Sequence, residues 1–386
     1  MYLLRCTDAT PQVRPQSARL FLVMDRVPTR WPRRAAGLCI VAVVGAAALL
    51  AWRLASPVPA HAGPRSDHFD GRRFFNDVPV AKSFTEFLRW RLTRDGSDAW
   101  RVDLTPPAVP PPPPRVPGAA LRITWINHAT VLIQTASLNL LTDPIWSARA
   151  SPLGWLGPRR HLAVGVPFPD LPPIDVVMLS HNHYDHMDLP SLARLAERDD
   201  PLFAVPLGNC VYLEGIVAAE RCREFDWWES FPAAPGVTVH AVPARHWSRR
   251  NPFDTNRALW GGWLVEAARR IYFAGDTGAG PQFAAIRERL GAPDLAILPI
   301  GAFLPRWFMA PQHLSPEEAV AAAGQLDARA AMAMHHACFN LADNGQWQPL
   351  HELAAALADG HSAGIDFWAP AHGDAREWTG SAVATH

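Results

Sequence analysis

The sequence of 386 residues predicts an α/β (α+β) fold in which two mixed sheets pack together with helices outside, a four-layer αββα sandwich. Two features of the pattern predict this fold. Between residues 121 and 144, apolar residues alternate at the two-residue period of half-buried strands, as in a β-meander. From residue 176 onward, short apolar runs alternate with helical patterns. Because 49% of the residues are hydrophobic, the chain can bury a substantial core.

The expected elements follow in chain order within a globular domain at residues 119–386. Strands are expected at residues 121–126, 130–135, 138–144, 176–179, 202–205, 237–242, 262–266, 271–274, 295–299 and 331–335. Helices are expected at residues 188–199, 281–290, 316–326 and 350–357. Before this domain, residues 53–118 are expected to form an extended lead-in. It contains a short helix at 83–92 and a stiff proline-rich linker from Pro106 to Pro117.

An uncharged apolar run at residues 35–52 follows a tail, residues 1–34, in which arginines stand at positions 26, 30, 33 and 34. The run is at the short limit of a membrane span and long for a signal-peptide core. We favour a transmembrane anchor over a signal peptide cleaved after Ala60-His61-Ala62, and either over a buried helix. Both export hypotheses place the tail in the cytoplasm. The domain would then face the periplasm from a bacterial inner membrane, or be free in the periplasm after cleavage.

Charge and cysteine content narrow the partners. The formal net charge is zero and no basic tract stands out, so nucleic acid is not an expected partner. Five cysteines form no disulfide framework. Cys210 and Cys222 are either a disulfide formed in an oxidising compartment or two buried thiols. The sequence does not predict the oligomeric state.

The motif "SHNHYDHMD" at residues 180–188 directly follows an apolar strand. His181 and His183, one residue apart at a strand end, can share one cation, while Asp185 and His186 are placed to face a second. Imidazole and carboxylate are ligands for zinc, and also for iron or manganese. A polar turn that caps the next helix is the alternative. The density of ligands in this spacing favours a metal site.

Three more candidate ligands end apolar strands further along the chain. His246 follows the strand at 237–242, Asp276 follows the strand at 271–274, and His335 closes the strand at 331–335. Taken singly, the two histidines are more typical of a satisfied core. As a series with the first motif, they are expected to complete a dinuclear site. Asp276 is the natural bridge, because a carboxylate can give one oxygen to each metal.

This ligand order resembles that of the metallo-β-lactamase fold. The chain is similar, more specifically, to the N-acylphosphatidylethanolamine-hydrolysing phospholipase D branch and its bacterial membrane-associated relatives. The histidine motif specifies only the superfamily, whereas "PRWFM" and "QHLSPEEA" are far more specific to this branch. The matching stretches cover most of residues 119–340: "NHATVLIQT", "LTDPIWSARASPLGWLGPRR", "SHNHYDHMD", "FDWWES", "RALWGGWLV", "FAGDTG" and "IGAFLPRWFMAPQHLSPEEA".

The resemblance implies a role for each matching residue. One zinc ion is expected on His181, His183 and His246, and the other on Asp185, His186 and His335, with Asp276 bridging. Asp143 would support a ligating histidine through its second ring nitrogen, or is simply a turn aspartate. Gln312 and His313 would contact the substrate or the leaving group, unless this segment caps the following helix. Asp185, Asp276 and His313 are the implied catalytic residues.

The chain also departs from the branch. After His335 it carries His336-Ala337-Cys338 where the branch has Trp-Gly, so two adjacent histidines compete as the last ligand; strand position favours His335. Asn127 stands where the family often has glycine, and we expect His372 to be structural. These differences leave the lipid specificity open.

The resemblance implies a hydrolase with two Zn2+ ions per chain, iron and manganese being the alternatives. Two metals lower the pKa of a bound water to about 7, which supplies a hydroxide nucleophile. The expected reaction is phospholipase D-type cleavage of N-acylphosphatidylethanolamine-like phospholipids. A hydrolase of another small-molecule ester, a lactone, an amide or a β-lactam, or a membrane-associated regulator of outer-membrane protein expression, are the alternatives.

A membrane is the expected partner of such an enzyme. A membrane-facing loop would account for five residues of the 141–160 stretch, although a core turn anchored by tryptophan explains them equally well. These residues are Trp146, Trp155, Leu156, Arg159 and Arg160.

Overall fold

The computed structural model describes residues 37, 41–51, 61–78, 83–94, 100–135, 138–359 and 364–379. The chain divides into two compact units, residues 1–54 and 55–386. In the first unit, residues 41–51 are helical. No helix in the described ranges is long and apolar enough to cross a membrane. The expected tail at 1–34 lies outside the described residues. Of the apolar run at 35–52, only residue 37 and residues 41–51 are described.

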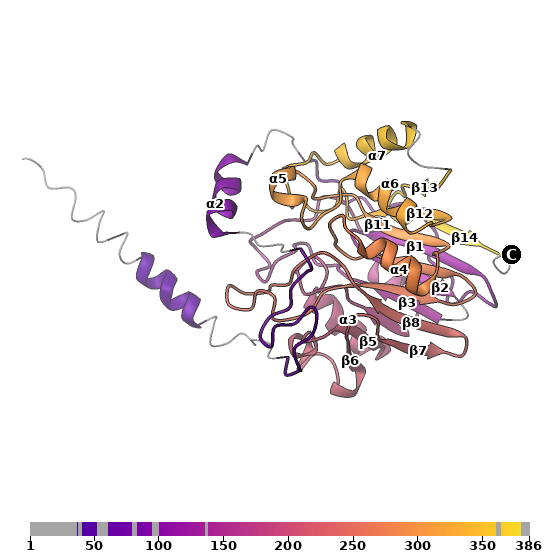
Figure 1. The fold of residues 1–386 in the computed structure, drawn as a ribbon, viewed down its shortest axis with the longest axis horizontal. Coiled ribbons are helices and arrows are strands. Elements are labelled where there is room, and N and C mark those ends of the chain that lie inside the picture. The colour runs from indigo at the N-terminus through magenta and orange to yellow at the C-terminus, as the bar shows by residue number, and fades with distance from the viewer. Residues whose placement is uncertain are drawn as a thin grey trace, which may run out of the picture. The chain divides into compact units, whose positions relative to one another are not determined.

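Two seven-stranded sheets make up the second unit, and both are mixed (Figure 1). Each contains three antiparallel and three parallel strand pairs. In spatial order, the first sheet consists of β14 (Ala375–Trp378), β1 (Leu121–Asn127), β2 (Thr130–Thr135), β3 (Leu138–Thr142), β4 (Val176–Met178), β5 (Leu202–Pro206) and β6 (Cys222–Phe225). The second consists of β13 (Asp366–Trp368), β12 (Ala330–Met334), β11 (Leu295–Pro299), β10 (Arg270–Phe273), β9 (Gly262–Glu266), β8 (Val237–Val242) and β7 (Ser230–Ala234).

The outer faces of the sheets are covered by α3 (Leu189–Asp199), α4 (Gln282–Leu290), α6 (Pro316–Gln325) and α7 (Gln348–Ala358). Helices α2 (Phe84–Thr93) and α5 (Arg306–Met309) lie beyond the sheets and pack on each other through Trp90 and Phe308. Short 3-10 turns are η1 (Phe168–Asp170), η2 (Cys210–Leu213) and η3 (Ala219–Arg221). Local sequence explains the start of α6, where Ser315 and Glu318 form a capping box and Pro316 occupies the first turn.

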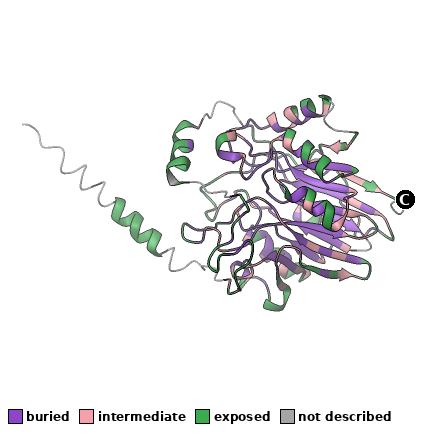
Figure 2. Ribbon diagram, in the orientation of Figure 1, coloured by how far each residue is buried: buried purple, intermediate pink, exposed green. Residues whose placement is uncertain are grey.

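Successive side chains along a strand point to opposite faces of its sheet, so each sheet packs against the other sheet on one face and against helices on the other. On β2, Val131 and Ile133 join the main core between the sheets, whereas Leu132 faces the other way and packs with Leu192 and Leu195 of α3. Figure 2 shows buried strands flanked by helices that expose one face. The predicted α/β fold of two mixed sheets with outer helices is therefore confirmed.

Four edge strands escaped the sequence prediction: β6, β7, β13 and β14. Edge strands are covered on one side only, and these are short, partly exposed and rich in polar residues or proline. The alternation that reveals a buried strand is therefore absent from them. Next to β6, the structure joins Cys210 to Cys222 by a disulfide.

The segment that we expected to be an extended lead-in packs closely on the two sheets and their loops. Phe69 and Phe74 are buried in a cluster with Ala244, Leu259 and Trp260. The proline-rich run is also tied to the first sheet, because the side chain of Gln134 donates to the carbonyl oxygen of Pro113 and that of Asn139 to Pro114. These described residues of the segment are therefore packed against the rest of the second unit rather than extended away from it.

Candidate metal centre

Three imidazole nitrogens converge on one point beside the loop that joins β4 to α3. Nε2 of His181 lies 2.8 Å from Nδ1 of His183, and Nε2 of His246 lies 3.2 Å from the same nitrogen. The nitrogens of a tetrahedral zinc site with bonds of ~2.0–2.1 Å are about 3.3 Å apart. The observed spacing therefore suits a single cation, and these three residues are the ones that the resemblance assigned to one zinc ion.

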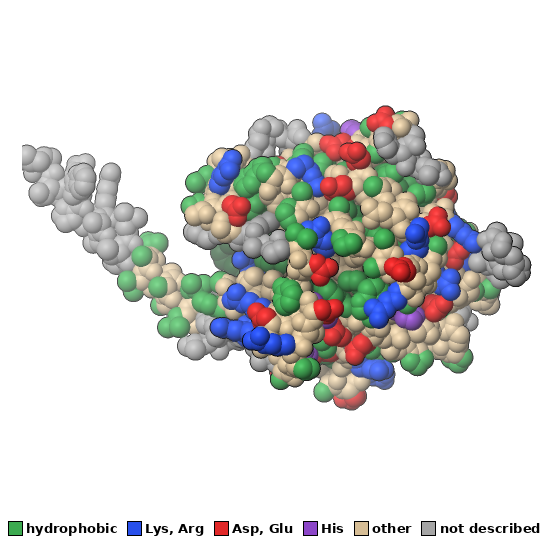
Figure 3. Space-filling model, in the orientation of Figure 1, with side chains coloured by type: hydrophobic (Ala, Val, Ile, Leu, Met, Phe, Trp, Pro, Cys, Tyr) green, Lys and Arg blue, Asp and Glu red, His purple; other side chains and the backbone are tan. Residues whose placement is uncertain are grey.

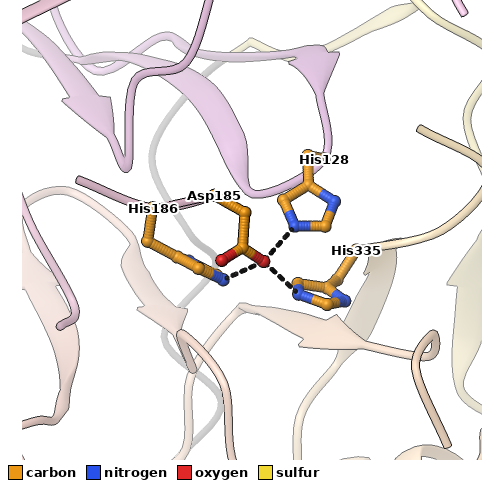
Figure 4. Close-up of side chains that lie close together, drawn as sticks. All are labelled: His128, Asp185, His186 and His335. Carbon is orange, nitrogen blue, oxygen red and sulfur yellow. Dashed lines mark hydrogen bonds and ion pairs between the residues drawn. The ribbon is translucent and has the colours of Figure 1, made fainter. Parts of the chain in front are cut away.

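A second group surrounds the carboxylate of Asp185 (Figure 4). Oδ2 of Asp185 lies 3.4 Å from Nε2 of His186 and 3.5 Å from Nε2 of His335. His128 adds a fourth side chain, with its Nε2 at 3.0 Å from the same oxygen. All four side chains point toward one another from three separate parts of the chain.

Asp276 stands between the two groups. Its Oδ2 is 3.2 Å from Nε2 of His186, and its Oδ1 is 3.2 Å from Nε2 of His335. The same Oδ2 lies 4.0 Å from Nε2 of His181 and 3.8 Å from Nε2 of His246. One carboxylate thus faces both groups, the position expected of a bridging ligand.

The topology explains why residues so far apart in sequence meet here. Each candidate follows the carboxyl end of a strand: Asp143 follows β3, the 180–188 motif follows β4, His246 follows β8, Asp276 follows β10 and His335 follows β12. Strands β3 and β4 are parallel, and β8, β10 and β12 also run in one direction through their pairings. Their carboxyl ends therefore lie at one edge of each sheet, the usual place for a site in such sheets.

Two glycines permit the close approach of these loops. Gly275 has a φ of +60°, and a Cβ at that position would lie 2.5 Å from Cβ of Ser180. A Cβ on Gly301 would lie 1.8 Å from the carbonyl oxygen of His335. A side chain at either position would displace Asp276 or His335 from the cluster.

Asp143 contacts two histidines of the 180–188 motif, His186 directly and His181 through Ser180. Nδ1 of His186 donates to Oδ2 of Asp143 over 2.7 Å, which leaves Nε2 to face the cluster. Ser180 donates its amide to Oδ1 over 2.7 Å and its hydroxyl to Oδ2 over 2.6 Å. The Ser180 hydroxyl in turn accepts from Nδ1 of His181 at 2.9 Å. One buried carboxylate thus orients two of the histidines.

Gln312 and His313 also border the cluster, in different ways. The carbonyl oxygen of Gln312 accepts a 3.0 Å hydrogen bond from Nδ1 of His246, so its main chain orients that ring. Its side chain is buried and lies next to Met309. Nδ1 of His313 lies 3.8 Å from Oδ2 of Asp276. Of the pair, His313 is the side chain at the cluster.

Charge in the site is balanced between carboxylates and imidazoles. Burial, followed by the neighbouring imidazoles, holds the pKa of His181 and His183 well below 6.5, so both rings are neutral at neutral pH. Burial alone would raise the pKa of Asp276, but His335, His186 and His313 outweigh it and hold that pKa well below its usual range. Neutral imidazoles and ionised carboxylates are the forms that bind metals.

The residues present fit a divalent cation. Nε2 of His186, Nε2 of His335 and Oδ1 of Asp276 are buried, face the cluster and make no hydrogen bond of regular geometry to the described residues. Buried polar atoms in a native protein are normally satisfied, and orphaned ones point to a missing ligand. Against the effect of burial, Asp276, Asp185 and Asp143 raise the pKa of His186 well above its usual value. The three carboxylates therefore favour a positive charge in the site, and a bound metal ion would supply it in place of a proton on His186.

His128 is a member of the cluster that no sequence pattern revealed. It lies in the turn between β1 and β2 with a φ of +43°, and its carbonyl oxygen accepts from the amide of His335 at 2.9 Å. Its motif, "NHATVLIQT", was the only signal, because a lone turn histidine has no ligand spacing. The structure also separates the adjacent histidines. His335 faces the cluster, whereas the ring of His336 packs against Trp125 with centroids 4.5 Å apart.

Residues 138–336 match the family described as "Beta-lactamase superfamily domain", and the match covers more than half of the chain. The chain belongs to this superfamily. The resemblance that the motifs suggested is thereby confirmed.

Two curated relatives are phospholipases by name. The chain is 37% identical to N-acyl-phosphatidylethanolamine-hydrolyzing phospholipase D 1 of Caenorhabditis elegans over 227 residues, covering 56% of this chain and 64% of that protein. It is 32% identical to the mitochondrial enzyme of the same name from Saccharomyces cerevisiae over 237 residues, covering 60% of this chain and 50% of that protein. The match thus spans less than two thirds of either relative.

Solved structures support the fold. A possible metal-dependent hydrolase from Veillonella parvula matches with a TM-score of 0.53 at 16% identity, covering 67% of this chain and 99% of that one. Together with the superfamily and its named hydrolases, the cluster identifies the chain as a metal-dependent hydrolase. The superfamily fold implies divalent metal ions, for which the two groups around Asp276 are the candidate site.

Proposed function

We propose that the protein is a phospholipase D-type phosphodiesterase that acts on N-acylphosphatidylethanolamine-like phospholipids with two zinc ions. The observation that carries this proposal is the position of Asp276 between two groups of ligands. His181, His183 and His246 would hold one ion. Asp185, His186 and His335 would hold the other. When bound, paired metals act as Lewis acids and generate a nucleophile from water near pH 7.

The side chains of the site suit an anionic diester. His181 and His183 are neutral, and the Ser180 hydroxyl holds the His181 ring from the side away from the cluster, so this ligand is oriented before substrate arrives. His313 lies beside Asp276 without belonging to either predicted ligand set. We assign it the substrate side, where its ring would give a proton to the leaving oxygen.

A loop beside the site suits a lipid surface. Leu153, Trp155 and Leu156 are 42%, 73% and 54% exposed. The base of the loop is closed by the amide of Ala150, which donates to the carbonyl oxygen of Pro158. Several adjacent large apolar side chains in water are unusual for a soluble surface and are typical of a docking site.

The loop is connected to the metal centre through its buried residues. Arg160 donates to Oδ1 of Asn127 over 3.0 Å, and Asn127 precedes His128 of the cluster. Trp146 is also turned inward and donates to the carbonyl oxygen of Val166. Of the five residues considered for membrane contact, Arg160 is thus buried and Trp146 is half-buried against the core. Trp155, Leu156 and Arg159 are exposed and remain candidates for lipid contact.

We further propose that the domain faces the periplasm. The disulfide between Cys210 and Cys222 supports this location, because such bonds persist in oxidising compartments and are rare in the cytosol. The arginine-flanked apolar run at 35–52 supports it from the sequence side. The test is labelling with a reagent that cannot cross the inner membrane, in cells with a permeabilised outer membrane and in lysed cells. Equal labelling of the domain in both samples supports export. Labelling only after lysis contradicts it.

Figure 3 shows acidic and basic side chains interspersed over most of the face in view, with one small basic cluster at its lower left and no long basic tract. That distribution agrees with a substrate bound through the metal centre and the apolar loop rather than through an extended polyanion site.

A phospholipid panel read by mass spectrometry tests the proposed reaction. The full chain with zinc is expected to release a phosphatidic acid-like product, and Asp276→Ala to abolish release. Asp170→Ala, at an exposed carboxylate, is the control and should be fully active. Cleavage confined to lactones, amides or β-lactams would favour the alternative hydrolase. Metal binding without turnover of any of these substrates would leave the regulator.

A further inference from the structure

We propose that residues 61–78, here called the N-terminal strap, are a working part of the metal centre, and that Asn76 is a positioning residue for His246. This inference rests on the proposed role of His246 as a metal ligand. The strap lies outside the family match at 138–336 and carries none of the predicted ligands. The strap would support the metal centre through its contacts with the stretch between β8 and β9, which carries His246.

The side-chain amide of Asn76 pairs with both main-chain polar groups of His246. Nδ2 of Asn76 donates to the carbonyl oxygen of His246 over 2.8 Å, and the amide of His246 donates to Oδ1 of Asn76 over 3.2 Å. Nε1 of Trp260 donates to the same Oδ1 over 3.2 Å. Asn76 is 6% exposed, so water cannot readily take over these bonds.

His246 lies further from its strand end than Asp276 and His335 do. His335 directly follows β12, and Asp276 stands three residues after β10, so the strand ladders fix their main chains. His246 lies four residues beyond β8, at the start of the irregular stretch that ends at β9. Asn76 holds its main chain and the carbonyl oxygen of Gln312 holds its ring. Together they direct Nε2 toward His183.

The strap is anchored to the same stretch that carries His246. A bridge pairs Phe69 with Phe74, and both rings pack on Ala244, Leu259 and Trp260. The amide of Phe74 donates to the carbonyl oxygen of Asn256 over 2.9 Å. These anchors reach both ends of the stretch between β8 and β9. Loosening the strap would therefore loosen the His246 loop first.

A polar contact at the start of the strap completes the anchoring. Nε2 of His68 lies 2.7 Å from Oδ1 of Asp226, and its ring stacks on Trp227 with centroids 4.4 Å apart. Nε1 of Trp227 donates to the carbonyl oxygen of Trp260, so this contact also reaches the His246 stretch. A catalytic unit cut at residue 119 would retain all seven predicted ligands and lose the support of one of them.

Zinc binding by full-length variants tests the proposal. Asn76→Ala is expected to lower the affinity for one of the two ions by about 10- to 100-fold, the usual effect of removing a group that orients a ligand, and to leave the other unchanged. Asn76→Asp keeps the acceptor for His246 and Trp260 but loses the donor, so its affinity should fall between those of Asn76→Ala and the wild type. Competition with a chromophoric chelator measures both affinities.

Asn139→Ala is the matched control. Asn139 is equally buried and also donates to main-chain carbonyl oxygens, those of Pro114 and Pro173, away from the cluster. It should lower the unfolding temperature and leave both zinc affinities unchanged. Unaltered zinc affinities in Asn76→Ala would overturn the proposal, whatever its stability.

His246→Ala separates this inference from the function on which it rests. Loss of one ion in His246→Ala, without any change in Asn76→Ala, rejects the strap alone. Retention of both ions in His246→Ala rejects the ligand assignment itself.

Discussion

Replacing Asp143 by asparagine should weaken metal binding without changing the shape of the site. The single oxygen of asparagine can still accept from the amide of Ser180. An NH2 group takes the place of the second carboxylate oxygen. It would face the Ser180 hydroxyl and Nδ1 of His186, which are both donors in the native arrangement. His186 can relieve the conflict by moving its proton to Nε2, the atom that faces Asp276. In that tautomer, Nε2 cannot bind a metal.

The expected loss is about 10- to 100-fold in affinity for the ion held by His186, or about 1.4–2.7 kcal/mol. Calorimetric zinc titration of the purified full chain measures it. Asp175→Asn is the control, since Asp175 precedes the same strand β4 at its other end and accepts from Arg115 and Asn139. Wild-type affinity in Asp143→Asn would refute the argument, because Asp143 would then not determine which nitrogen of His186 is free.

Three further predictions concern the loop, the strap and the disulfide. Combined Trp155→Ser and Leu156→Ser should lower binding to phosphatidylglycerol-containing vesicles at least ~10-fold, because each exposed side chain contributes about 2 kcal/mol when it is buried in the membrane. Turnover of a soluble diester should be unchanged. Trp347→Ser, at another exposed tryptophan, is the control, and an equal loss of vesicle binding in that variant would contradict the role of the loop. Burial lowers the pKa of His68, but Asp226 and Asp67 outweigh it and raise that pKa above 6.5. Its stabilising contribution is therefore complete below pH 6.5 and lost as the pH rises through the raised value, so the stability gap between wild type and His68→Gln should narrow upward from pH 6.5; a constant gap contradicts this. Combined Cys210→Ser and Cys222→Ser should lower the unfolding free energy by about 3 kcal/mol for a loop of this length, measured by urea unfolding, and an unchanged midpoint would show that the pair is not bonded.

The sequence predicted those parts of the site that lie next to buried strands. Asp276 and His335 could be placed because each closes an apolar run, and parallel strand ends meet at one edge of a sheet. Asp143 also ends a strand, but its supporting role came from the family resemblance, and the sequence alone left a turn aspartate equally open. Its link to His186, over 43 residues, follows from the pairing of β3 with β4.

Other parts could not be predicted because they depend on contacts between distant segments. Asn76 contacts His246 across 170 residues, and nothing in "RRFFND" signals a partner in a loop beyond β8. His128 was hidden because its turn lacks ligand spacing. The same limit led us to expect an extended lead-in. Phe69 and Phe74 are buried by residues far along the chain, such as Trp260, and the local sequence does not show this contact.

The metal content of the purified full chain tests the central claim most directly. Elemental analysis after saturation with zinc and removal of excess metal should give two zinc ions per chain, and fewer in Asp276→Ala, because one carboxylate serves both groups. The same measurement on protein purified without added metal separates zinc from iron or manganese. A single ion per chain, or two ions retained without Asp276, would contradict a dinuclear centre built around that residue.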